Sequence, residues 1–310
     1  IVFIIIYLKL YIVKIKLTTV YTYNEDSLPM NREINAMPKI KMTAFALIVA
    51  TLTMLVSQTV SAATVDPSKM DYNNLEMLTF FTFFVGYISM GAAFVFFIVE
   101  RGNVAPQYRT TMTISALIVG IAAMHYYYMR GVYIDHGVVS IEYRYMDWII
   151  TVPLMALKFP SLVGKEAITD KKVLGLGFTG ICFLGALIMI GFGYAGESGM
   201  MPEIPALLLG GMGWAMIIVA TGTPWTNGIG VDNSMIANEL QWSTDALRWF
   251  IVVGWVIYPI GYLFSPEVAL VDGVSQEAMA VLYNSADMIN KIGFGVVAWM
   301  GAKKATSMMA

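Results

Sequence analysis

Seven apolar stretches, each close to the roughly 20 residues that a helix needs to cross a bilayer, recur along this chain. Hydrophobic residues make up 58% of the sequence and charged residues 13%, a balance that excludes a soluble domain of this length. The pattern predicts an all-α membrane protein, a bundle of seven transmembrane helices. The expected spans lie at about 75–99, 110–129, 141–159, 173–194, 205–221, 247–264 and 278–300.

A secretory signal peptide is predicted at 37–62, ahead of the first span. Met37 opens a basic start, an apolar run follows at 44–56, and small residues surround the expected cleavage point near Ala62. Such a leader would send the segment that follows it across the membrane.

Residues 1–36 carry apolar runs interrupted by lysine, and we interpret them as an extension translated from upstream. The alternative is a membrane anchor at 1–13, which is short for a span. The membrane domain itself is expected at 63–310.

Charged residues in the connections predict the orientation of the bundle. Loops rich in lysine and arginine stay in the cytoplasm, so the amino terminus is expected outside and the carboxyl terminus inside. The basic residues follow the first, third and seventh spans, and the acidic residues crowd the loops after the fourth and sixth: Arg101, Arg109, Lys165, Lys171, Lys172, Lys303 and Lys304 against Glu197, Glu203, Glu267, Asp272 and Glu277.

Several kinds of site find no support in the composition. One cysteine, Cys182, and two histidines give neither a disulfide framework nor a metal cluster, so no metal is predicted. A formal net charge of -2 gives no indication of a nucleic-acid partner.

Ionisable residues inside the apolar spans point to function, because a charge at hydrocarbon depth is costly. Asp287 precedes Lys291 by one helical turn in the last span. In the third span, five residues, four of them polar, are separated by three, four, four and three positions, and this spacing places them on one face of a helix. The stripe consists of Arg144, Asp147, Thr151, Met155 and Lys158. Asp147 and Lys158 are about 16 Å apart along the helix axis, which is the layout of a proton relay.

These residues resemble the motifs of a known family. The segment from Arg144 to Leu154, with Asp147-Trp148 inside it, is similar to the third helix of microbial rhodopsins, and Asp287-Met-Ile-Asn-Lys291 is similar to the end of their seventh. The resemblance covers about 70–305 and includes His125 in the second span, which is similar to a proteorhodopsin histidine. It implies a seven-helix bundle around all-trans retinal that moves ions with light, a transporter and not an enzyme.

The resemblance also implies roles for individual residues. Lys291 would carry retinal as a protonated Schiff base, Asp147 would be the counterion and proton acceptor, and Asp287 would be the secondary counterion. Arg144, Thr151 and His125 would form the charge cluster and acceptor network around Asp147, although a neutral histidine in the core is the alternative for His125. The retinal pocket would be lined by Trp148, Met155, Trp214, Trp255, Tyr258 and Tyr283. An apolar residue at Met155, a position that tunes colour in proteorhodopsins, resembles the green-absorbing forms.

Lys158 departs from the commonest pattern. Most proteorhodopsins carry a carboxylic acid eleven residues after the acceptor, and it returns a proton to the Schiff base. A smaller group, typified by an Exiguobacterium rhodopsin, has lysine there. We interpret Lys158 as the proton donor, since burial favours its neutral form; the alternative is a lysine that reaches to the membrane surface.

The favoured function is an outward light-driven proton pump, and a photosensor that signals to a membrane partner is the alternative. Chloride-pumping relatives have a neutral residue at Asp147 and sodium-pumping relatives have Asn and Gln in this stripe, and neither pattern is present. The resemblance implies a bacterial inner-membrane protein in contact with lipid, a homo-oligomer (pentamer or hexamer), and protons as cargo. Leu207 stands where some relatives have the glycine that admits an antenna carotenoid, so no such pigment is expected.

Overall fold

The computed structural model describes residues 73–268, 270–271 and 274–309. The predicted signal peptide at 37–62 and the extension at 1–36 lie outside these described residues.

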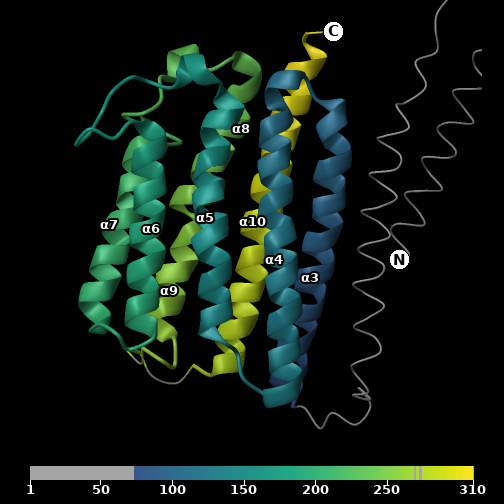
Figure 1. The fold of residues 1–310 in the computed structure, drawn as a ribbon, viewed down its shortest axis with the longest axis vertical. Coiled ribbons are helices and arrows are strands. Elements are labelled where there is room, and N and C mark those ends of the chain that lie inside the picture. The colour runs from purple at the N-terminus through teal and green to yellow at the C-terminus, as the bar shows by residue number, and fades with distance from the viewer. Residues whose placement is uncertain (1–72, 269, 272–273, 310) are drawn as a thin grey trace, which may run out of the picture. The chain divides into compact units, whose positions relative to one another are not determined.

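Within the described residues, long helices stand side by side and run back and forth along one direction (Figure 1). A short 3-10 turn, η6, joins two of the helices end to end, so that the eight α-helices make seven rods. The helices are α3 (Asn74–Glu100), α4 (Arg109–His136), α5 (Ile141–Val163), α6 (Phe178–Glu197), α7 (Glu203–Thr221), α8 (Asn238–Val252), α9 (Ile257–Phe264) and α10 (Gln276–Ser307), with η6 at Gly254–Val256.

Short elements lie in the connections. Strands β1 (Gly222–Thr223) and β2 (Thr226–Asn227) form an antiparallel hairpin after α7, with Gly222 opposite Asn227. The remaining 3-10 turns are η2 (Arg101–Asn103), η3 (Pro106–Tyr108), η4 (Lys165–Ala167) and η5 (Asn233–Met235).

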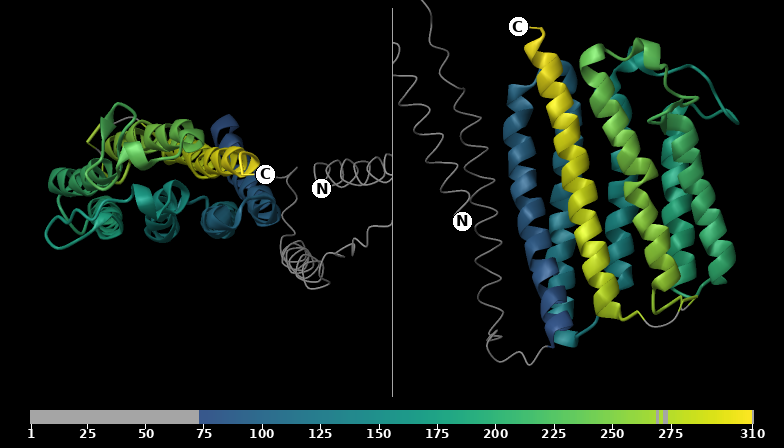
Figure 2. Two further views of the ribbon diagram at one scale, coloured as in Figure 1. Left: turned by 90° about the horizontal axis from the view of Figure 1, so that it is seen from above. Right: turned by 180° about the vertical axis from the view of Figure 1, so that it is seen from behind.

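The rods form a closed bundle in two rows (Figure 2). From α3 to α7, each helix packs on its neighbour in sequence, and α10 closes the bundle by packing on α3 and α8. Six of the rods are long and apolar enough to cross a membrane, and α10, which carries more charges, is the seventh. The arrangement confirms the predicted seven-helix membrane bundle.

Local sequence signals set several of the helix ends. Asn73 forms a capping box with Glu76 at the start of α3, accepting the Glu76 N–H at 3.0 Å. The side chains of Ser140 and Ser275 cap α5 and α10. Gly137 ends α4 with a φ of 66°, a left-handed conformation that suits glycine.

Two predicted span limits are wrong for physical reasons. The fourth span was expected from Val173, but Val173 and Leu176 exchange backbone hydrogen bonds in a tight turn and α6 begins only at Phe178. The sixth span was expected from Leu247, but α8 begins at Asn238. Hydropathy missed this start because the first turns of α8 carry polar residues.

Close helix packing holds α6 against α7. A Cβ atom added at Gly185 would lie 2.6 Å from the carbonyl oxygen of Gly213, so only a glycine permits this approach. The close contact of Gly185 with Gly213 positions α7, which contributes Leu207 and Trp214 to the wall of a cavity.

Candidate functional site

The centre of the bundle holds one ammonium group between two carboxylates. Lys291, on α10 and 2% exposed, forms ion pairs with Oδ2 of Asp147 on α5 and with Oδ2 of Asp287, the latter at 2.9 Å. Asp287 is one turn before Lys291 on the same helix, whereas Asp147 is brought to it only by the packing of α5 on α10. Buried charges persist when they are paired in this way.

Asp287 accepts hydrogen bonds from three other side chains. The hydroxyl of Tyr258 donates to Oδ1 at 2.7 Å, and the hydroxyl of Tyr126 donates to Oδ2 at 2.9 Å. The indole N–H of Trp148 lies 3.2 Å from both oxygens. With Lys291 added, the ionised carboxylate has partners at both oxygens. Tyr126 was not among the residues predicted from sequence.

Asp147 is placed differently. It is fully buried, Oδ2 meets Lys291, and Oδ1 has no hydrogen-bond partner among the described residues. One oxygen of this carboxylate is therefore left open to a further proton or donor.

Two residues expected to join Asp147 bond elsewhere. Thr151 donates to the backbone carbonyl of Asp147 at 2.9 Å and not to its carboxylate, the usual back-bond of a helical threonine. His125 has Nδ1 3.0 Å from the carbonyl oxygen of Ile121, within its own helix, and no hydrogen bond links its ring to Asp147 in the described part of the chain.

Arg144 lies toward the N-terminal end of α10 from this ion-pair centre. Its Nη2 donates to Oδ1 of Asn284 at 3.2 Å, and Nδ2 of Asn284 donates to Thr82 at 3.1 Å. The guanidinium carbon is 5.0 Å from the ring centroid of Tyr283. Asn284, which the sequence reasoning missed, could have been found from its position one turn before Asp287.

Glu197, expected in a loop, is the last residue of α6 and is 5% exposed. Its Oε2 accepts from the hydroxyl of Tyr145 at 2.7 Å, and its Oε1 accepts from Ser265 at 2.9 Å. Its two hydrogen-bond partners come from α5 and from the residue that follows α9, both distant in sequence, which explains why sequence alone gave no sign of its burial.

Lys158 lies on the other side of the centre, along α5. It is fully buried, so it does not reach the surface, and Nζ has no hydrogen-bond partner in the part of the chain that the structure describes. The nitrogen lies 4.9 Å from the ring centroid of Phe294, and no carboxylate pairs with it among the described residues.

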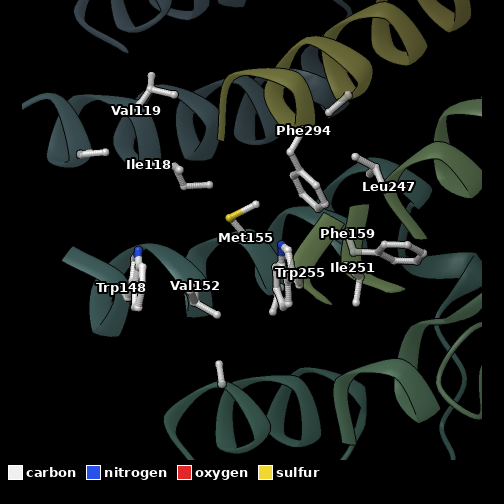
Figure 3. Packing of buried hydrophobic residues seen from close by; sticks show 14 of the residues in the cluster. Ile118, Val119, Trp148, Val152, Met155, Phe159, Leu247, Ile251, Trp255 and Phe294 are labelled. Carbon is white, nitrogen blue, oxygen red and sulfur yellow. The ribbon is translucent and has the colours of Figure 1, made fainter. Parts of the chain in front are cut away.

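A cavity with an empty volume of about 810 Å³, counting its open part, extends from Lys291 between α5, α6, α7 and α9. All six residues predicted to line a pocket do line this one, together with Leu207, Asp287 and Lys291: Trp148, Met155, Trp214, Trp255, Tyr258 and Tyr283. Trp148, Met155 and Trp255 come from α5 and η6 (Figure 3).

The lining fits a long apolar ligand with a reactive carbonyl at one end. Aromatic and aliphatic side chains form most of the wall, and Lys291 is the one amine in it among the described residues. The adjacent carboxylates would balance the positive charge of a protonated Schiff base formed at Lys291 Nζ. Retinal has this chemistry.

Known proteins match the chain over the same region. The blue-light absorbing proteorhodopsin of the gamma-proteobacterium Hot 75m4 is 36% identical over 241 residues, covering 73% of this chain and 86% of that protein. The green-light absorbing proteorhodopsin of the gamma-proteobacterium EBAC31A08 is 36% identical over 216 residues, covering 70% and 83%.

The fold also matches solved structures. The crystal structure of Exiguobacterium sibiricum rhodopsin aligns with a TM-score of 0.61 at 34% identity, covering 75% of this chain and 99% of that one. The model of the family described as bacteriorhodopsin-like protein matches residues 76–305. The chain is therefore a membrane-spanning member of the bacteriorhodopsin-like family, the microbial rhodopsins, whose cofactor is retinal held on a lysine as a Schiff base.

Proposed function

We propose that this protein is an outward light-driven proton pump. The observation that carries the proposal is the unequal bonding of two carboxylates that meet one ammonium group. Asp287 has partners at both oxygens, whereas Asp147 has one oxygen free in the described structure. The related proteorhodopsins and the fit of the cavity to retinal support the same reading.

Lys291 would hold retinal, which supplies visible absorption and, through its isomerisation, the energy that drives the proton. Nζ of Lys291 carries the proton at rest, between the two carboxylates. Hydrogen bonds to a charged group contribute about 1.5–3 kcal/mol each, so the donors Tyr126, Tyr258 and Trp148 favour an ionised Asp287. Asp147 is left as the acceptor of the proton that leaves Nζ.

The charged loops support the direction of transport. With the lysine-rich and arginine-rich loops in the cytoplasm, Arg144 lies on the outer side of the ion-pair centre and Lys158 on the inner side. Protons would leave past Arg144 and enter past Lys158. The chain would lie in the bacterial cytoplasmic membrane with its amino terminus outside.

Lys158 would return the proton to Lys291. A buried ammonium without a counter-charge is costly, so Lys158 is neutral at rest and takes up a proton from the cytoplasm before passing it on. This order is the reverse of a carboxylic acid donor, which gives its proton first.

A photosensor is the second candidate, since relatives include sensory rhodopsins. Sensory rhodopsin-2 of Natronomonas pharaonis is 31% identical over 160 residues, which is 50% of this chain and 59% of that protein. A sensor would use the same cavity and ion pairs but would move no net protons.

The test is the pH of an unbuffered suspension of cells that express the full chain with all-trans retinal. Light should acidify the medium, and a protonophore should abolish the change. Asp135→Asn, which removes an exposed charge at the end of α4, serves as a control that should pump. A coloured protein that leaves the pH unchanged would instead support the sensor.

A further inference from the structure

Arg248 is the largest fully buried side chain of the described residues, at 1% exposure, and it is not among the residues that line the cavity. It lies on α8, two turns before Trp255. Its guanidinium makes three hydrogen bonds: Nε to the carbonyl of Thr221 at 2.9 Å, Nη2 to Oδ1 of Asn233 at 2.7 Å, and Nη1 to Oδ1 of Asp245 at 3.0 Å. One side chain thus joins α8 to the last residue of α7 and to the loop at 222–237.

That loop also pairs with the connection between α5 and α6. The backbone N–H of Asp232 donates to the carbonyl of Ala167 at 2.8 Å, and the N–H of Thr169 donates to the carbonyl of Gly230 at 3.1 Å. A β-bridge between Ile168 and Val231 lies between these bonds. The two loops therefore cover one end of the bundle together, and the hydrogen bonds of Arg248 connect them to α8.

Lys158 faces the same end of the bundle. The guanidinium carbon of Arg248 lies 5.6 Å from the ring centroid of Phe159, the residue that follows Lys158 on α5. Leu247, Phe159 and Phe294 lie near one another in the interior (Figure 3), and all three are fully buried. The ring of Phe294 is the one next to Lys158 Nζ. Water from this end can reach Lys158 only if that packing opens.

The charged groups around the guanidinium come from few elements. Asp245 on α8 forms the ion pair with Arg248 and is 44% exposed. On α5, Lys158 is a second basic side chain, and it has no carboxylate partner among the described residues. Thr221 of α7 and Asn233 of η5 contribute neutral oxygens, and the exposed Lys165 and Glu166 lie on η4, which packs on η5.

We propose that Arg248 is a positioning residue for proton uptake. Its bonds to Thr221 and Asn233 hold the loop-covered end of the bundle shut, so that a proton reaches Lys158 only after this end opens. The inference rests on the proposed function, since it assigns the entry route of the pumped proton.

The test compares Arg248→Gln and Asn233→Ala with the parent protein by flash photolysis at a series of pH values. In the parent, opening limits the recovery step that depends on Lys158, so its rate should not change with pH. Loss of hydrogen bonds to a charged group should speed this step by about tenfold in Arg248→Gln and should make its rate proportional to the proton concentration. Asn233→Ala, which keeps the bonds to Thr221 and Asp245, should give a smaller change in the same direction.

Lys172→Gln is the matched control. Lys172 is an exposed cation of the α5–α6 connection with no hydrogen bond or ion pair in the described structure, and its removal should leave the recovery rate flat with pH. Hydrogen exchange in the dark is a second measurement, independent of light. The amides of Thr169 and Asp232 should exchange faster in Arg248→Gln than in Lys172→Gln.

The outcomes separate this inference from the pump itself. If the parent acidifies the medium and both variants keep its rate and its flat pH profile, the role of Arg248 is wrong, whatever hydrogen exchange does. A parent protein that completes its photocycle without acidifying the medium contradicts the pump. In that case, a recovery rate that depends on pH in Arg248→Gln and not in the parent would still support the role of Arg248 in holding this end of the bundle shut. If Arg248→Gln fails to form pigment, the test rests on Asn233→Ala. A faster, pH-dependent recovery in that variant supports the role of Arg248, and a recovery equal to that of the parent contradicts it.

Discussion

Asp147 and Asp287 contact the same ammonium nitrogen of Lys291 but differ in the hydrogen bonds that they accept. Asp287 has tyrosine and tryptophan donors in addition to the lysine, and Asp147 has only the lysine among the described side chains. The two carboxylates therefore have different surroundings, and the surroundings of a carboxylate decide how readily it binds a proton.

Replacing Asp147 with Asn should abolish light-driven acidification, since an amide cannot take the proton from Lys291 Nζ. The visible band should move to longer wavelength, because a negative charge that stabilises the cationic ground state is lost. Absorption spectra and pH recordings check both effects. Continued acidification at the parental rate would show that another group is the acceptor.

Replacing Lys291 with Ala should remove all visible absorption after addition of all-trans retinal. The cavity would still be apolar, but the amine in its wall would be gone. Lys304→Ala removes an exposed lysine from the end of the same helix and should keep the colour. A visible band that survives in Lys291→Ala would overturn the assignment of the attachment site.

Replacing Lys158 with Ala should slow the return of the proton to Lys291 by about a hundredfold, the usual contribution of a positioned acid or base. A small membrane-permeant weak acid added to the medium should restore the rate, since it supplies the missing proton carrier. Flash photolysis in the visible range measures both. Kinetics equal to those of the parent protein would exclude Lys158 as the donor.

Replacing Gly185 with Ala should lower the temperature at which the pigment bleaches. The new Cβ would meet the carbonyl oxygen of Gly213 at 2.6 Å, and overpacking of this kind costs about 1–3 kcal/mol. Gly191→Ala, on the same helix with nothing within 4 Å of its Cβ, should be neutral or stabilising by up to about 1 kcal/mol. Equal bleaching temperatures for the two variants would contradict the close packing of α6 on α7.

The lining of the cavity shows how far a sequence pattern reaches. The resemblance to microbial rhodopsins implied that Trp148, Met155, Trp214 and Trp255 line a retinal pocket, and all four line the cavity. The spans themselves follow from hydropathy, because a bilayer demands long apolar segments. The polar start of α8 was missed by the same argument, because Asn238, Glu239 and Gln241 lower the local hydropathy although they belong to the helix.

Sequence alone determined the number of spans, the pairing of Asp287 with Lys291 one turn apart, and the stripe that carries Asp147 and Lys158, since each depends on helical periodicity within a single segment. Tertiary structure decided which donors reach Asp287, where Thr151 and His125 bond, and which groups of α7 and of the following loop Arg248 contacts. These contacts join residues from different helices or choose between rival partners, and only the packing of the whole bundle settles that choice.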